Sequence, residues 1–161
     1  MREIIFRGKD KLGHWLYGGF HLWETRQPCV CDDELKPEEI KHIIIKNSFA
    51  DWNMPRTMQP YEVIPETVGQ YTGLADKNGT KVFEGDILKF TDKCSNYEWI
   101  GKVEFGNPNA EYNWGFQLVY ISGAKPNTDI LLWFEMEETG AFSEVIGNIH
   151  DNPELLKECE G

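Results

Sequence analysis

The sequence predicts a mainly β protein at the margin of the α+β class, and three observations support this prediction. Short β-prone runs recur along the chain and are separated by segments rich in glycine, proline and asparagine. Two later segments alternate apolar and polar residues with the period of a strand. No long helical pattern alternates with these runs, which argues for a small barrel or sandwich rather than a parallel α/β sheet.

The first half of the chain predicts an opening hairpin and one further strand. Residues 4–6 and 15–17 are β-prone, and the glycine-containing segment between them suits a connecting turn. Residues 42–45 predict a strand, with a helix beginning at Pro37 as the competing interpretation. Residues 47–60 have the composition of a loop, because prolines and isolated large side chains replace any regular pattern.

The second half carries sharper strand signals. The pair Asn78-Gly79 is a strong hairpin cue and predicts a type I′ or a bulged turn. Gly85 is expected to provide a positive φ or a close backbone approach just before a strand. Residues 98–105 and 114–120 both alternate, so we expect them to pair as antiparallel neighbours.

Towards the C-terminus the pattern predicts two more strands and a short helix. Residues 130–134 are apolar throughout, and their aromatic content favours a strand. Residues 144–149 are predicted to form the closing strand. Asn152 as an N-cap, Pro153 at the first helical position and Glu154 in the first turn favour a short terminal helix.

Charge and cysteine content restrict the environment and the partners. The 161 residues carry a formal net charge of −11, with acids concentrated from Glu135 onward, which disfavours nonspecific nucleic-acid binding. No stretch approaches the roughly 18 apolar residues of a membrane helix, and the N-terminus lacks a signal-peptide core, so we expect a cytoplasmic protein. In a reducing compartment the cysteines are expected to be free thiols. These cysteines are Cys29, Cys31, Cys94 and Cys159.

Residues 63–79 read Val-Ile-Pro-Glu-Thr-Val-Gly-Gln-Tyr-Thr-Gly-Leu-Ala-Asp-Lys-Asn-Gly and continue to Glu-Gly-Asp-Ile at 84–87. This stretch closely resembles the central signature of the YopX family. The opening at 2–7 and the ending at 144–156 are similar to that family's two ends, so the resemblance spans nearly the whole chain. It implies a phage- or prophage-encoded protein in the cytoplasm of a bacterial host, and it implies no established reaction.

The resemblance also implies a domain organisation. We expect an N-terminal β-rich extension over residues 1–62, comprising the hairpin and the irregular loop. Residues 63–161 are then expected to form a small SH3-like β-barrel that ends in the short helix. An SH3-like fold does not itself specify a ligand.

One set of side chains invites a metal-site interpretation, namely His14, His21, Cys29 and Cys31. Structural zinc sites usually separate paired cysteines by two to four residues, whereas a single residue separates this pair. We therefore interpret the cysteines as thiols near a loop, and we expect neither a metal nor a cofactor.

The sequence offers no recognisable catalytic constellation. No cysteine or serine lies in a nucleophile elbow, and the glycines lack the lysine and hydroxyl residue of a phosphate-binding loop. Glu84 and Asp86 form a carboxylate pair around Gly85, but at a strand entrance such groups favour turn formation or solvent exposure. We therefore expect a protein that is not an enzyme.

The large aromatic side chains in the second half of the chain either pack in the core or line a binding groove. Alternation favours the core for most of them. They are Trp99, Tyr112, Trp114, Phe116, Tyr120 and Trp133.

By elimination, the leading hypothesis is an accessory protein that binds another protein or itself as a homo-oligomer. Trp52, Met54 and Met58 are the candidate partner-binding residues, because interfaces use tryptophan and methionine as anchors. One alternative is an acidic mimic that occupies the DNA-binding groove of a host protein. The other is nucleic-acid binding by the barrel through a local basic cluster. That cluster would comprise Lys77, Lys81, Lys89, Lys93 and Lys102.

Overall fold

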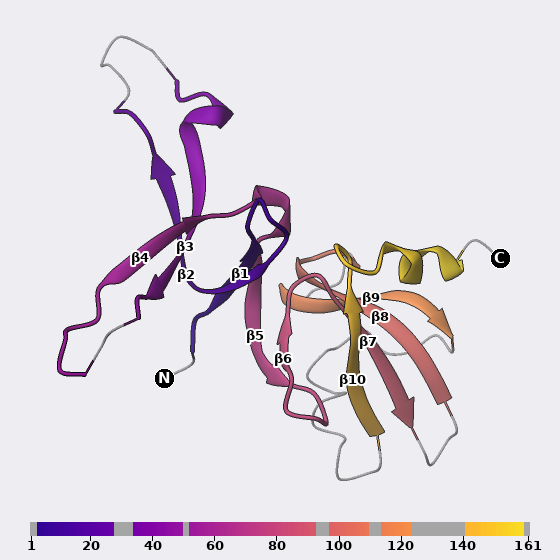
Figure 1. The fold of residues 1–161 in the computed structure, drawn as a ribbon. Helices are drawn as coiled ribbons and strands as arrows, with labels where there is room; N and C mark the ends of the chain where they lie inside the picture. The colour runs from indigo at the N-terminus through magenta and orange to yellow at the C-terminus, as the bar shows by residue number, and fades with distance from the viewer. Residues whose placement is uncertain are drawn as a thin grey trace. The chain divides into compact units, whose positions relative to one another are not determined.

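The structure is a computed structural model that describes residues 3–27, 34–49, 52–92, 97–109, 114–123 and 141–159 (Figure 1). These residues are mainly strands in two antiparallel sheets, which confirms the predicted mainly β class. The chain divides into two compact units, Met1–Gln70 and Tyr71–Gly161. Within the described part, no helix is long and apolar enough to span a membrane.

The first unit holds five strands of an antiparallel sheet, in the order β4-β3-β2-β1-β5, so the chain crosses from β4 to the far side of β1 before it forms β5. Its strands are β1 (Phe6–Lys9), β2 (Trp15–Glu24), β3 (Ile40–Asn47), β4 (Met58–Glu62) and the first residues of β5 (Gly69–Ala75). The predicted opening hairpin and the strand at 42–45 are confirmed as β1–β2 and β3. The competing helix at Pro37 is a single 3₁₀ turn, Pro37–Glu39, that leads directly into β3.

Strand β2 changes partner halfway along its length. Its first residues pair with β1 up to Gly18, and from Gly19 onward it pairs with β3. A Cβ atom at Gly18 would lie 2.1 Å from the carbonyl oxygen of Ile45, so only glycine fits at the point where the partners change. Strand β4 pairs with β3 only from Ile43 onward, so the ends of β2 and β3, residues 22–24 and 40–42, continue as a two-stranded ribbon (Figure 1).

Residues 63–70, which the sequence placed with the C-terminal domain, lie in the first unit. The N–H of Val63 donates to the carbonyl of His42 at 2.9 Å, and the N–H of Ile64 donates to the carbonyl of Lys9 at 2.8 Å. The 3₁₀ turn Pro65–Thr67 then leads into β5. These bonds add the segment to the sheet of the first unit.

The second unit contains a four-stranded antiparallel sheet in the order β10-β7-β8-β9. The elements of the whole unit are the remainder of β5, then β6 (Lys81–Phe83), β7 (Asp86–Asp92), β8 (Tyr97–Gly106), β9 (Gly115–Gly123), β10 (Ala141–Asn148) and the 3₁₀ helix Pro153–Cys159. The two alternating segments do pair, as β8 with β9, and the predicted closing strand is β10. The predicted strand at 130–134 lies outside the described residues.

The described strands of this unit do not close into a barrel. Strand β10 pairs with β7, and no ladder among the described residues joins β9 to β10, so both are edges of an open sheet. The SH3-like closure expected from the family resemblance is therefore not found, because it requires edge strands to meet across a ring. The C-terminal residues adopt a 3₁₀ helix.

The core of the second unit lies on one face of this sheet. Its buried members are Val82, Leu88, Phe90, Trp99, Val103 and Leu118. Along β8 the predicted inward face is correct for Trp99, Gly101 and Val103, whereas Phe105 is exposed.

Tyr120 is 38% exposed, so its predicted core position is wrong, and a β-bulge directly follows it in the strand. Ile100 pairs with Ser122 while Gly101 pairs with Tyr120, which leaves Ile121 as the extra residue on β9. An extra residue reverses the alternation beyond it, so Ile121 is buried on the face that Leu118 occupies before the bulge. Trp114 is also exposed, Phe116 is half-buried, and the remaining two aromatics lie outside the described residues.

Two turns of the molecule share one sequence and one set of hydrogen bonds. Each has the pattern Asp-Lys-x-Gly, from Asp10 to Gly13 and from Asp76 to Gly79. In each, the aspartate side chain accepts hydrogen bonds of 2.8 to 2.9 Å from the N–H groups two and four residues later. Both glycines have a positive φ and Asn78 does not, so the predicted hairpin at 76–79 uses a bulged turn rather than type I′.

Candidate functional site

The loop between β3 and β4 begins from an ordered stem. The N–H of Ser48 donates to the carbonyl of Thr57 at 2.7 Å, and the two hydroxyl oxygens lie 2.8 Å apart. The N–H of Thr57 also donates to the Ser48 hydroxyl at 3.1 Å. These bonds extend the hairpin beyond the last residues of its strands and hold the base of the loop.

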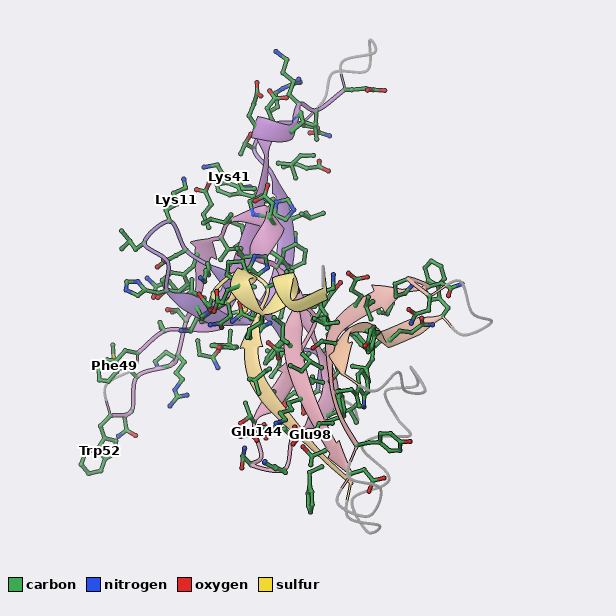
Figure 2. The ribbon with its side chains drawn as sticks, turned by 90° about the vertical axis from the view of Figure 1, so that its right-hand side faces the viewer. Lys11, Lys41, Phe49, Trp52, Glu98 and Glu144 are labelled. Carbon is green, nitrogen blue, oxygen red and sulfur yellow. The ribbon has the colours of Figure 1, made fainter. Side chains whose placement is uncertain are left out.

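Four apolar side chains of this hairpin face solvent, and we call them the apolar tip. The exposed fractions are 95% for Phe49, 91% for Trp52, 66% for Met54 and 77% for Met58. Figure 2 shows Trp52 at the far end of the hairpin loop and Phe49 nearer to the strands. Clustered exposed apolar side chains are a feature of interaction surfaces, whereas scattered ones are ordinary.

All three residues that the sequence proposed for partner binding are exposed on this hairpin, and Phe49 is exposed there with them. The sequence analysis missed Phe49 as a site residue because an isolated aromatic in a loop reads the same whether it is buried or exposed. No local sequence pattern marks Phe49, because the Ser48–Thr57 bonds that place it just beyond the stem join residues from both sides of the loop.

The segment that carries the apolar tip has no formal net charge, although the whole chain is acidic. Residues 49–58 contain one acid, Asp51, and one base, Arg56, so their formal charge is zero while the whole chain carries −11. Asn53 has a φ of 65°, a left-handed conformation that asparagine tolerates better than most residues. Asn53 forms a turn together with Trp52.

A carboxylate at the far end of β4 ties three elements of the first unit together. Glu62 contacts the ammonium groups of Lys11 at 3.1 Å and Lys41 at 3.3 Å, from the β1–β2 turn and from β3 respectively. The bond from Lys11, and then that from Lys41, hold the pKa of Glu62 below its ordinary value despite partial burial. All three groups are substantially exposed, so the network orders the hairpin base but contributes little stability.

The lysines proposed for nucleic-acid binding already have partners in the second unit. Lys77 contacts Glu144 at 2.5 Å, Lys89 contacts Glu98 at 3.0 Å, and Lys102 pairs with Glu104. Lys81 lies over the ring of Tyr71 at 5.1 Å, and Lys93 lies outside the described residues. A phosphate approaching these lysines would meet a carboxylate beside three of them, which opposes binding.

The C-terminal acids that motivate the mimic hypothesis are only partly described. Glu144 contacts Lys77, Asp151 accepts from the Asn148 side chain at 2.7 Å, and Glu154 accepts from the Asn152 side chain at 3.1 Å. The acids at 135–138 and 160 lie outside the described residues. The described acids thus have structural partners, and the mimic hypothesis stays a prediction.

The carboxylate pair at 84–86 forms a turn. Asp86 is buried, and its side chain accepts the N–H of Phe83 at 2.7 Å. Gly85 has a positive φ, as the sequence predicted, and its N–H donates to the carbonyl of Val103 at 2.9 Å. The geometry gives Asp86 a structural role in holding β7 beside the turn.

The candidate metal set is only half described. His14 lies at the β1–β2 turn, with Nδ1 3.3 Å from a carboxylate oxygen of Asp10, and His21 lies exposed in β2. Cys29 and Cys31 lie outside the described residues. Elsewhere in the described chain, no three histidine, cysteine, aspartate or glutamate residues gather in an arrangement suited to a metal ion.

These observations define a mainly β protein of two sheet-bearing units that presents an apolar hairpin tip. The sequence model of the family described as YopX protein matches residues 19–157, so the chain belongs to the YopX family. Among solved structures, the crystal structure of protein EF1440 from Enterococcus faecalis is 24% identical in sequence. That similarity covers 98% of this chain and 100% of the other, with a TM-score of 0.48. No curated protein matches the sequence.

Proposed function

We propose that this YopX-family chain is a phage- or prophage-encoded accessory protein that acts in the bacterial cytoplasm without catalysing a reaction. Its role is to bind protein, either a different protein or a second copy, through the apolar tip. The observation that carries this proposal is the exposure of Phe49, Trp52, Met54 and Met58 on one hydrogen-bonded hairpin.

The energetics of burial favour such a role. Covering a fully exposed Phe or Met side chain contributes about 1.5 to 3 kcal/mol, and tryptophan is among the commonest residues to dominate binding energy. Because Phe49 and Trp52 expose nearly their whole side chains, almost all of that contribution is available to a partner. The zero formal charge of residues 49–58 adds no electrostatic preference, so the association is expected to be apolar.

The test compares two variants of the tagged protein in the bacterial host during phage induction. The first carries Trp52→Ala, Met54→Ala and Met58→Ala together. The second carries Trp114→Ala, which removes a tryptophan that is 76% exposed in the second unit and serves as the matched control. We expect the first variant to lose self-association or a captured protein, and the control to retain it.

The proposal fails if the triple variant changes neither the oligomeric state nor any captured protein. Washing at about 1 M salt adds a second readout, because exposed charge interactions are then screened beyond about 3 Å. An apolar association persists in that wash. A partner that is released by salt and is indifferent to the triple variant would instead support the acidic-mimic alternative.

A further inference from the structure

Apolar residues are distributed unevenly between the two units. Among the described residues, the second unit buries ten apolar side chains and exposes four large ones. In the described part of the first unit, nine large apolar side chains are exposed, and the buried apolar ones are Ile43, Ile44 and Val63. A unit of about 70 residues with so small a core is only marginally stable alone. We therefore expect a binding partner to bury part of its exposed apolar surface.

Charge distribution favours the first unit as the place where two copies can meet. Nine basic and eleven acidic residues give Met1–Gln70 a formal charge of −2, whereas seven basic and sixteen acidic residues give Tyr71–Gly161 a charge of −9. Two identical chains of charge −11 repel each other, and this repulsion is weakest where the charge density is lowest. The segment that carries the apolar tip, residues 49–58, is such a place, because its formal charge is zero.

Strand addition along β4 is disfavoured, so we expect association at this hairpin to use side chains. Ser48 bonds to Thr57 and Val63 bonds to His42, and these pairs fix the odd-numbered residues of β4 as the ones that bond to β3. The even-numbered residues therefore turn their backbone groups outward. Pro60 is the middle one of these and has no N–H, which removes the central donor of the outward edge.

We infer that the apolar tip is the interface of a two-fold symmetric homodimer, in which the tip of one copy packs against the tip of a second copy. This inference rests on the proposed function, because it takes the tip as the binding surface. A second copy is the one partner always present when the chain is made, and a two-fold interface needs a self-complementary patch. The tip meets that need, because its four side chains are apolar and the segment that carries them, residues 49–58, has one charge of each sign.

The available area suits a modest dimer. Aromatic side chains bury about 150 to 250 Å² each, so the four side chains of the tip offer roughly 500 Å² or more per copy. Two copies then bury about 1,000 Å² or more, the lower bound for a specific interface. We expect a dimer that dissociates on dilution through the micromolar range.

Sedimentation velocity of the full chain over a series of concentrations tests the inference. The wild type, with a monomer mass of 18.7 kDa, is expected to shift to twice that mass as concentration rises. Phe49→Ala and Trp52→Ala should each raise the dimer dissociation constant about tenfold or more, and Trp114→Ala should leave it unchanged. Circular dichroism confirms that each variant is folded.

Salt and charge give an independent readout. Because the copies are both acidic, raising the salt concentration should strengthen the dimer. Arg56→Glu gives residues 49–58 a formal charge of −2 and should weaken the dimer at low salt, with recovery at high salt. A dimer that high salt dissociates would contradict the inference.

The outcomes separate this inference from the proposed function. A wild type that stays monomeric at every concentration, or a dimer that Phe49→Ala and Trp52→Ala do not weaken, overturns the two-fold interface. If the chain is monomeric and the tip variants still lose a captured host protein, the second copy is the wrong occupant and the binding role stands. If the tip variants change neither property, both proposals fall.

Discussion

The indole of Trp99 on β8 stacks on the ring of Phe90 on β7, with ring centroids 4.2 Å apart and planes inclined by 14°. The two residues are direct partners in the ladder, and both are completely or almost completely buried. The indole also covers Gly101, where a Cβ atom would lie 2.5 Å from Cζ3 of Trp99. The missing side chain at Gly101 thus provides the space that the indole fills.

Gly101→Ala is expected to destabilise the protein by about 1 to 3 kcal/mol, because the added methyl group overpacks the core against the indole. Urea unfolding measures the change. The same substitution in a Trp99→Leu background provides the control, since the clash then disappears and the two effects become non-additive. An equal cost in both backgrounds would show that the indole is not the cause.

Two adjacent glycines in β2 should respond differently to the same substitution. Gly18→Ala places a Cβ 2.1 Å from the carbonyl oxygen of Ile45, a backbone atom that cannot move aside, and we expect a loss of about 2 kcal/mol or more. Gly19→Ala meets no atom within 4 Å and is expected to be neutral or to stabilise by up to about 1 kcal/mol. Thermal unfolding of the two variants under identical conditions gives the comparison, and equal melting temperatures would refute it.

Asp76 should make the free energy of unfolding depend on pH in the acidic range. Burial raises the pKa of its carboxyl, but hydrogen bonds from the N–H groups of Val145, Thr80 and Asn78 outweigh burial and lower the pKa below 3.8. A lowered folded-state pKa means that the stabilisation is complete above the unfolded-state pKa and is lost as the pH falls through the folded-state value. Stability measured by urea unfolding should therefore decline below about pH 5.

Asp76→Asn tests this assignment, since it keeps the shape and removes the charge. We expect a loss of about 1 to 3 kcal/mol at neutral pH and a flatter dependence below pH 5 than in the wild type. Asp10→Asn is the matched control, because Asp10 occupies the same Asp-Lys-x-Gly turn at a half-buried position, whereas Asp76 is buried, and it should change stability less. Identical acid profiles for the wild type and Asp76→Asn would count against Asp76 as a source of the decline.

Features set by neighbouring residues were predictable from the sequence. The turn at Asp76 to Gly79 and the pairing of β8 with β9 follow from short patterns, because turn chemistry and alternation act over a few residues. The bulge at Ile121 and the partner change of β2 at Gly18 depend on strands far apart in the sequence. Barrel closure is the same kind of long-range property, and the described strands do not show the closure that the family resemblance implies.

The candidate site was predictable in kind but not in full. Loop composition placed Trp52, Met54 and Met58 on the surface, since prolines and isolated large residues leave no regular face to bury them. Whether their side chains gather with Phe49 depends on the Ser48–Thr57 stem, and no local pattern announces that pair of hydrogen bonds.

The second unit is expected not to bind nucleic acid even at low salt. Lys77 and Lys89 each lie within 3.0 Å of a carboxylate, so a phosphate would have to displace Glu144 or Glu98 while approaching a chain of charge −11. Fluorescence titrations with single- and double-stranded DNA and with RNA should be flat. The variant Glu98→Gln with Glu144→Gln frees both lysines, and it is the informative companion. Binding only by that variant would identify the carboxylates as the barrier, whereas binding by the wild type that weakens steeply with salt would restore the basic-cluster hypothesis.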